Sequence, residues 1–269
     1  MSTDGSAESF VRVERKGNVA VVTLDRAPVN AVYRAVYRQI EETFDSFALD
    51  KGVHAVVFTG AGDRVFSAGV DLKVMATDRD DVVAAGSASD LLDLGRSARR
   101  AFSSLYRCAV PVVGAINGPA IGAGLVLAAL CDVLIVSERA TLAATEINVG
   151  RLGAYSQLQR LVGPFRARVA YLTGEPITAA ELHAMGAAHL VVEPDALLDE
   201  AISFAQSLAA KSPIAVRLAK EVIVRVEHLP WEDGYRTEQD YTTRLGTFDD
   251  AEEARLAFVE KRDPSWSWR

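Results

Sequence analysis

The sequence predicts an α/β fold with largely parallel strands, and two observations support this prediction. Short apolar runs, such as residues 19–24 (VAVVTL) and 54–59 (HAVVFT), alternate with segments of helical periodicity. The second run is apolar almost throughout, which is typical of a parallel strand buried on both faces. Alternation of strand and helix along a chain is the pattern of α/β folds.

The segment between these two strands, residues 32–47, predicts an amphipathic helix. Its apolar side chains recur at helical spacing and form one face: Tyr33, Val36, Tyr37, Ile40, Phe44 and Phe47. Three further apolar runs predict strands, at residues 111–116, 132–136 and 189–192. Residues 125–130 are apolar on all sides, so a helix there is expected to be buried.

Two regions differ from this alternating pattern. Residues 77–99 are rich in Asp, Ala, Ser and Arg, and they predict a loop or frayed helix of a length that is often functional. After Pro194 the pattern is helical to the end, with amphipathic segments at 197–210 and 214–226 and a last helix near 251–260.

The helical end of the chain predicts a region distinct from the α/β core. We expect the boundary at residue 200, with a core over 1–200 and a C-terminal helical region over 201–269. Trp266 and Trp268 lie in a tail after the last helix. Exposed aromatic side chains in such a tail often pack on a neighbouring subunit, so an oligomerisation role is expected.

Composition and charge exclude several classes of protein. The net charge of −7 argues against a nucleic-acid partner. No run approaches the ~20 apolar residues of a membrane span, and the N-terminus lacks an apolar signal core, so a cytoplasmic protein without a membrane partner is expected. Cys108 and Cys131 lie among apolar residues and are predicted to be buried free thiols. The four histidines are scattered, so no metal site is predicted.

Two turns rich in small residues are the candidate functional segments. They are residues 66–72 (FSAGVDL) and 117–124 (NGPAIGAG), and each follows a predicted strand. Small residues let a ligand approach the backbone, and the start of a helix offers unpaired N–H groups. Two such donors aimed at one oxygen would form an oxyanion hole, although the glycines could equally serve tight turns alone. The glycine patterns of dinucleotide-binding and P-loop proteins do not occur.

Both turns, in this order, resemble the enoyl-CoA hydratase/isomerase (crotonase) family, and the resemblance covers nearly the whole chain. It includes Leu24-Asp25-Arg26, Asn30-Ala31, Cys131-Asp132, Glu146-Ile147 and the segment 258–262 (FVEKR). The resemblance implies a crotonase-like spiral of ββα units with a C-terminal helical trimerisation region. It also implies an acyl-CoA substrate, with coenzyme A bound as part of that substrate and no permanently bound cofactor, and a homotrimer or a dimer of trimers.

The family pattern assigns roles to backbone groups in the two turns. The resemblance implies that the N–H groups of Val70 and Ala123 are the oxyanion donors. Ala123 stands where the family has the middle glycine of a triplet, and alanine can replace it if its φ is negative. Asp71 is expected to brace the first turn rather than to react.

The same resemblance implies a coenzyme A site. Arg26 and Lys73 match positions near the phosphates and adenine, although either could be a solvated surface cation. Ala68 matches a position whose carbonyl contacts the adenine. Phe258 and Lys261 match a tail region that reaches the coenzyme A of a neighbouring subunit.

One carboxylate of the family's catalytic pair is absent. Hydratases of the family use two glutamates, and the matching positions here are Val126 and Glu146. Adding water needs a base and an acid, and one positioned group of this kind is worth roughly 10²–10⁴ in rate. Moving a double bond from the 3- to the 2-position needs only one carboxylate. If Glu146 is that base, apolar neighbours should raise its pKa. The alternative is that Glu146 is an exposed carboxylate at a strand end without a catalytic role.

The stretch after Glu146 also departs from the hydratase pattern. Family hydratases carry Pro-Gly-Ala-Gly-Gly where this chain has residues 153–157 (GAYSQ). Tyr155 and the nearby Arg151 add polar bulk, and either could contact substrate, donate a proton or serve packing. We place both in the substrate pocket with Val126, and the acyl group and pathway stay open.

Four functional interpretations follow from these residues. The preferred one is a double-bond isomerase of unsaturated acyl-CoA that uses Glu146. The alternatives are a hydratase or lyase in which another group replaces the missing glutamate, and an acyl-CoA-binding protein with little catalysis. A serine hydrolase using Ser67 is disfavoured, because no His or Asp stands in a suggestive motif beside it.

Overall fold

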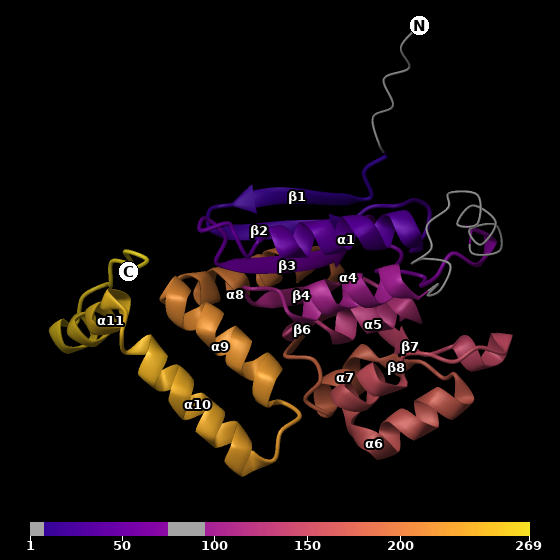
Figure 1. The fold of residues 1–269 in the computed structure, drawn as a ribbon. Helices are drawn as coiled ribbons and strands as arrows, with labels where there is room; N and C mark the ends of the chain where they lie inside the picture. Colours follow the sequence, from indigo (N-terminus) through magenta and orange to yellow (C-terminus); the bar gives the residue numbers. More distant parts are fainter. Residues whose placement is uncertain (1–7, 75–94) are drawn as a thin grey trace, which may run out of the picture.

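A six-stranded sheet forms the centre of the protein, whose computed structural model describes residues 8–74 and 95–269 (Figure 1). Only the first pair of strands is antiparallel, and every other neighbouring pair is parallel. The strands follow one another across the sheet in this order: β1 (Val11–Lys16), β2 (Val19–Leu24), β3 (Ala55–Gly60), β4 (Val112–Ile116), β6 (Val133–Ser137) and β9 (Leu190–Val192). The predicted α/β class is therefore confirmed.

A second, smaller sheet lies beside the first. It consists of β5 (Ala120–Ile121), β7 (Thr141–Ala143) and β8 (Ile177–Thr178), with β5 parallel to β7 and β8 antiparallel to it. Because β5 leads directly into the buried helix α5 (Ala123–Ala129), this small sheet fixes the residues where that helix begins.

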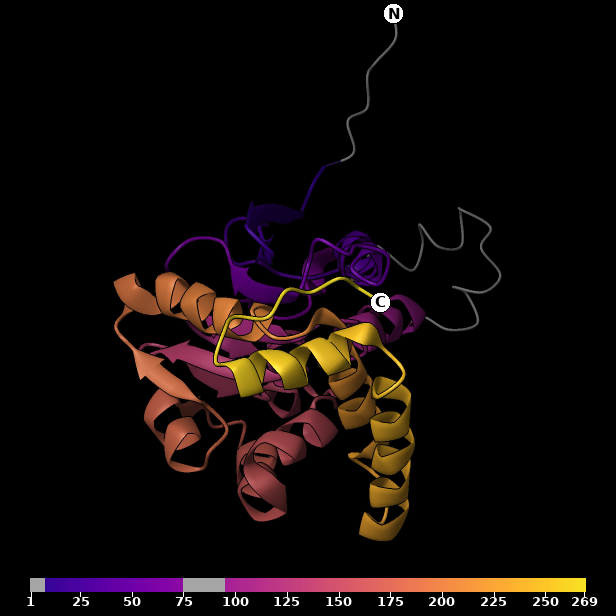
Figure 2. The same cartoon turned by 90° about the vertical axis from the view of Figure 1, so that its left-hand side faces the viewer.

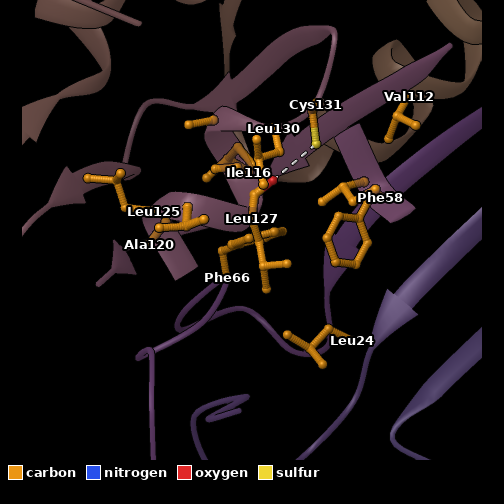
Figure 3. Close-up of a cluster of buried hydrophobic side chains, with 14 of the residues drawn as sticks. Leu24, Phe58, Phe66, Val112, Ile116, Ala120, Leu125, Leu127, Leu130 and Cys131 are labelled. Carbon is orange, nitrogen blue, oxygen red and sulfur yellow. Dashed lines mark hydrogen bonds between the residues drawn. The ribbon is translucent and has the colours of Figure 1, made fainter. Parts of the chain in front are cut away.

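Helices cover both faces of the large sheet. On one face lie α5 and the pair α1 (Arg34–Ser46) and α4 (Arg96–Tyr106), and on the other lies α8 (Leu197–Ala209) (Figure 1). The core beneath α5 contains Phe58, Phe66 and Leu127, and Figure 3 shows these side chains converging. Burial of such side chains on both faces is the main favourable contribution to the fold.

Three phenylalanines connect helix, strand and turn. The Phe58 ring meets Phe44 of α1 edge-on at a centroid distance of 5.3 Å, and it meets Phe66 at 5.4 Å. Phe66 opens the first candidate turn and is fully buried. Edge-to-face pairs of this kind add about 0.5–1.5 kcal/mol beyond area burial, so the turn is held by its first residue.

The remaining elements follow in chain order. The short helix η1 (Glu146–Val149) leads to α6 (Tyr155–Thr173) and α7 (Ala179–Ala184), and η2 (Pro194–Ala196) precedes α8. The expected boundary at residue 200 falls inside α8, whose Leu197, Ala201 and Ala205 pack on the large sheet. We therefore propose that the core extends to the end of α8 and that the C-terminal region begins after it.

The C-terminal region is a series of three helices. They are α9 (Pro213–Val226), α10 (Trp231–Leu245) and α11 (Asp249–Glu260), and α10 and α11 extend away from the core in Figure 1. In the part of the chain that the structure describes, no helix is both long and apolar enough to cross a membrane.

The aromatic tail folds back onto its own chain, where both Trp266 and Trp268 are partly buried, while its expected packing on a neighbouring subunit stays a prediction. Asp250 is fully buried and accepts hydrogen bonds from the backbone N–H groups of Ser267 and Trp268. The Trp268 ring lies 5.2 Å from the Arg217 guanidinium carbon. Trp266 Nε1 donates to the carbonyl of Ala210 at 3.1 Å. Figure 2 shows the tail running from α11 back towards the core.

The predicted strands agree with the observed ones within one residue, and the helices of the C-terminal region are confirmed in outline. The predicted loop over 77–99 lies mostly outside the described residues, while its last residues belong to α4. The sequence did not predict the strands β1, β5, β7 and β8, the helices α4, α6, α7 and α10, or the short helices η1 and η2.

Candidate active site

The two turns lie side by side. The N–H of Ile121 donates to the carbonyl of Ser67 at 2.9 Å, and Ser67 and Ala120 form a parallel bridge. The N–H of Val32 donates to the carbonyl of Gly69 at 2.8 Å. These bonds join the first turn to the second turn and to the segment before α1.

Gly69 is required at the point of closest approach between the turns. Its φ is +83°, which L side chains rarely adopt. A Cβ placed on it would lie 2.5 Å from the Ile121 carbonyl oxygen and 3.3 Å from the Ala123 nitrogen. The backbone beside Val70 and the backbone nitrogen of Ala123 are therefore direct neighbours.

The N–H groups of Val70 and Ala123 are open donors in these turns. Neither forms a hydrogen bond to any acceptor within residues 8–74 and 95–269. Ala123 is the first residue of α5, and its φ is negative. This is the condition under which alanine can replace the glycine of the family pattern. Ala123 also follows Gly122, whose φ is +55°. Both residues line one cavity.

The cavity has a volume of about 300 Å³, at the lower end of the range for small-molecule sites. Its lining comes from the two turns, α1, α4, α5 and the η1 region. The described lining residues are Tyr37, Ala68, Gly69, Val70, Leu72, Ala98, Phe102, Ile121, Gly122, Ala123, Val126, Thr145, Glu146, Val149, Arg151, Leu152, Gly153 and Ala154.

Glu146 presents its carboxylate to this cavity at the start of η1. A Cβ on Gly122 would lie 3.0 Å from Glu146 Oε1, so the carboxylate sits directly beside the residue that precedes Ala123. Oε2 is buried and has no hydrogen-bond partner among the described residues. Burial raises the pKa of Glu146 above its ordinary value, as the sequence predicted.

Val126 projects from the first turn of α5 and is buried. It lines the cavity at the position where the family pattern has its other glutamate. Among the described lining residues, Glu146 is the only acid. The site thus combines two backbone donors with a single carboxylate.

Arg151 and Tyr155 have different positions relative to the cavity. Arg151 lines it, and its backbone N–H donates to the Glu146 carbonyl at 2.9 Å. Tyr155 does not belong to the described lining, and its ring packs edge-on against Tyr171 at 5.2 Å. The Tyr171 hydroxyl accepts a hydrogen bond from the N–H of Gly153 at 3.3 Å, so the two tyrosines hold the segment between η1 and α6 in place.

Three of the residues predicted to hold coenzyme A, namely Arg26, Lys73 and Ala68, lie in or beside the first turn. Arg26 Nη2 lies 2.8 Å from Asp71 Oδ2, so much of its charge is compensated. Asp71 also accepts from the backbone N–H groups of Lys73 and Val74, as expected of a residue that braces the turn. The bond from Val74 and the ion pair with Arg26 lower the pKa of Asp71. The Lys73 side chain is exposed, and Ala68 lines the cavity.

Three sequence-predicted groups lie elsewhere. Phe258 and Lys261 belong to the end of α11, at the far left of Figure 1 and away from α5, and neither lines the cavity. Ser67 is fully buried, and its hydroxyl donates to the Asn30 carbonyl at 2.7 Å. This geometry does not suit a nucleophile, which argues against the serine hydrolase.

Sequence reasoning missed Tyr37, Leu72, Ala98, Phe102, Val149 and Leu152 as part of the cavity. Tyr37 followed the apolar face of a helix and was therefore read as a core residue. In the described ranges, no group of three or more His, Cys, Asp or Glu side chains could hold a metal ion. Cys108 and Cys131 are buried free thiols, as predicted.

Comparison with known proteins decides the family. The family model described as enoyl-CoA hydratase/isomerase matches residues 14–269. The chain belongs to the enoyl-CoA hydratase/isomerase family. A hydrolase from Rhodococcus jostii, named for (7aS)-7a-methyl-1,5-dioxo-2,3,5,6,7,7a-hexahydro-1H-indene-carboxyl-CoA, is 35% identical over 91% of this chain and 92% of its own. A carnitinyl-CoA dehydratase from Salmonella arizonae is 34% identical over 95% of this chain and 97% of its own.

Solved structures of enoyl-CoA hydratase/isomerase family members share the fold. The enoyl-CoA hydratase of Bacillus anthracis superposes with a TM-score of 0.88 at 28% identity, over 97% of this chain and 100% of that one. Pseudomonas aeruginosa DspI gives the same TM-score at 28% identity, over 99% of this chain and 100% of that one. The expected crotonase-like fold with a helical C-terminal region is therefore confirmed, and the protein is an enzyme of the crotonase superfamily.

Proposed function

We propose that this crotonase-family enzyme shifts the double bond of a 3-enoyl-CoA to the 2-position, using Glu146 as its single base. The observation that carries the proposal is the combination of two open backbone donors with one carboxylate in the same cavity. The donors suit the oxygen of a thioester enolate, and the carboxylate suits the proton transfers on either side of it.

The proposed reaction moves one proton and one double bond. Glu146 takes a proton from C2 of the 3-enoyl thioester, and the electrons pass to the thioester oxygen. The N–H groups of Val70 and Ala123 stabilise the resulting dienolate. Protonated Glu146 then returns the proton to C4, which leaves the double bond between C2 and C3 and restores the carboxylate.

Hydration is the less favoured reaction for this cavity. Water addition to a 2-enoyl thioester needs one group to activate the water and another to protonate C2. The second position is occupied by the buried, apolar Val126. The loss of one positioned acid–base group costs roughly 10²–10⁴ in rate, which is enough to suppress ordinary hydration.

The remaining parts of the proposal follow the family pattern. Arg26, Lys73 and the Ala68 carbonyl would contact coenzyme A bound as part of the substrate. Phe258 and Lys261 would reach the coenzyme A of a neighbouring copy, in a homotrimer or dimer of trimers located in the cytoplasm. The exposure of Phe258, at 86%, supports a contact outside its own chain.

A second candidate is hydrolysis or dehydration of a functionalised acyl-CoA. The identity of 34–35% to the hydrolase and the dehydratase favours it. In that case a group other than a second glutamate would assist Glu146.

One panel of assays separates these functions. The purified protein is incubated with a 3-enoyl-CoA and, separately, with a 2-enoyl-CoA, while conjugation of the thioester is followed. The isomerase produces conjugation from the first substrate. Rapid loss of conjugation from the second substrate would instead identify a hydratase. Silence with both, together with binding measured by calorimetry, would favour the second candidate or an acyl-CoA-binding protein.

A further inference from the structure

The side chain of Tyr37 is a buried polar group that the proposed reaction does not use. It projects from α1, is only 6% exposed and lines the cavity. Its ring packs edge-on against Phe102 of α4 at a centroid distance of 5.6 Å. Its hydroxyl forms no hydrogen bond to any residue in the two described ranges.

The Tyr37 hydroxyl is not among the buried atoms without a partner, so it is open to the cavity that Tyr37 lines, where a bound acyl chain would cover it. A polar group that a ligand covers without offering a partner weakens binding, so such groups are normally satisfied by protein, water or ligand. The surroundings of Tyr37 in the cavity are apolar, with Phe102, Ala98 and Leu72 among the lining residues. Burial raises the pKa of Tyr37 further above its ordinary value, so the hydroxyl stays protonated and can donate a hydrogen bond.

Arg151 adds a second donor to the cavity. It comes from the loop after η1, whereas Tyr37 comes from α1. A guanidinium is always charged and carries only donors, so it favours an oxygen acceptor and disfavours a cationic group. Most of the other described lining side chains are apolar, including Val126, Val149 and Leu152.

We propose that the cavity selects acyl-CoA substrates whose acyl chain carries an oxygen acceptor, a ketone or a carboxylate, which Tyr37 and Arg151 hydrogen-bond. This inference rests on the proposed binding of acyl-CoA in the same cavity and names its substrate class. A plain hydrocarbon chain would leave the Tyr37 hydroxyl buried and unsatisfied. A site whose polar groups hydrogen-bond the substrate discriminates strongly against an analogue that lacks the matching group, because those polar groups are then left without a partner.

Binding of three saturated thioesters of equal chain length tests this selection. Hexanoyl-CoA has no distal oxygen, 5-oxohexanoyl-CoA carries a neutral ketone, and adipoyl-CoA carries a carboxylate. Calorimetry gives the dissociation constant of each with the complete protein. We expect at least one of the two oxygen-bearing thioesters to bind tenfold or more tightly than hexanoyl-CoA. The thioester that does so shows whether the preferred acceptor is a ketone or a carboxylate.

Two variants and two matched controls assign the selection to its residues. Tyr37→Phe should reduce the preference over hexanoyl-CoA to less than threefold for the ketone. Arg151→Gln should reduce it mainly for the carboxylate. Tyr235→Phe, on exposed α10, and Arg168→Gln, on the exposed side of α6, should leave both ratios unchanged.

Each outcome bears on one proposal. Equal or tighter binding of hexanoyl-CoA by the wild type would overturn the inference, as would unchanged ratios in both variants. Because the readout is a ratio, a variant that merely loosens the fold weakens all three thioesters together. If none of the three thioesters binds, the proposed acyl-CoA function itself is wrong. If the protein isomerises a plain 3-enoyl-CoA but binds the three thioesters equally, that function stands and only the proposed selection is wrong.

Discussion

Glu146 is the residue on which the proposed chemistry depends. Its carboxylate lies beside Gly122, where any side chain would meet it, and Oε2 has no partner among the described residues. Burial raises its pKa, and a raised pKa brings a carboxylate closer to the basicity needed to take a proton next to a thioester. The same environment means that the ionised form is reached at a higher pH than for an exposed glutamate.

This environment predicts the pH dependence of isomerisation. The base acts only when ionised, so kcat/KM should rise with pH and level off above the pKa of Glu146. The inflection should lie above the ordinary value of 4.5, because desolvation disfavours the carboxylate. A pH–rate profile with a 3-enoyl-CoA measures this inflection. An inflection at or below 4.5 would contradict the burial of the working carboxylate.

At the scale of elements, the start of α5 determines what the cavity can bind. The helix places the Ala123 N–H beside the segment 66–72 and directs Val126 into the cavity from the first turn of the helix. A helix start also contributes a partial positive charge that favours an oxyanion. Two substitutions on α5 test these separate contributions.

Ala123→Pro removes one donor while keeping a helix-compatible residue. Proline is well tolerated at the first helical position, so the variant should stay folded. Loss of one oxyanion donor typically costs about 10²–10³ in kcat, and the proline ring would also enter the space of the oxygen. Initial rates with a 3-enoyl-CoA, together with a thermal melt, measure the effect. A folded variant with an undiminished rate would remove Ala123 from the oxyanion hole.

Val126→Glu restores the carboxylate that hydratases of the family pattern possess. The new side chain would face the cavity opposite Glu146 and supply the second acid–base group for water addition. We expect slow loss of conjugation from a 2-enoyl-CoA, where the wild type shows little. Val126→Gln is the matched control, since it has the same shape without the carboxylate. Equal behaviour of the two variants would contradict the alignment of this position with the missing glutamate.

The elements differ in how far the sequence could predict them, for physical reasons. Buried strands such as β3 were located from their continuous apolar runs. The edge strand β1 was missed because all but its first residue are exposed and it reads as polar, VRVERK. Helix α6 was missed because Gly163 and Pro164 interrupt its pattern and Gly163 is non-helical.

Candidate site residues that belong to a sequence motif could be predicted, whereas residues that reach the cavity only through the packing of the fold could not. The positions of Val70, Ala123 and Glu146 followed from the family resemblance. The cavity role of Tyr37 could not be read from the sequence, because a cavity-facing and a core-facing tyrosine have the same place in a helical repeat. Its contact with the cavity depends on how α1 packs on α4.

At the scale of the whole molecule, the C-terminal region is joined to the core by buried polar contacts. Lys220 of α9 pairs with Asp132 at the start of β6, and the side chains are 4% and 14% exposed. Arg217 donates to the carbonyls of Phe47, Asp50 and Val53. The returning tail then covers Arg217 with Trp268. The position of α9 is thus set by the core.

Breaking the buried ion pair should destabilise the protein strongly. Lys220→Met leaves the Asp132 carboxylate largely buried without its counter-charge, which typically costs about 3–5 kcal/mol. Urea denaturation measures the loss. Lys211→Met, at an exposed position, is the control and should change the free energy of unfolding by less than about 0.5 kcal/mol. Equal effects of the two substitutions would contradict a structural role for the pair.

The central claim for the whole enzyme is that its cavity forms a thioester enolate with two backbone donors and Glu146 alone. Exchange of the C2 protons of a saturated acyl-CoA for deuterium in heavy water, followed by mass spectrometry, measures this step without any later chemistry. The account predicts exchange well above the buffer rate with the wild type and with the exposed control Glu175→Gln, and exchange at the buffer rate with Glu146→Gln. Exchange that persists in Glu146→Gln, or none in a wild type that binds the thioester, would contradict it.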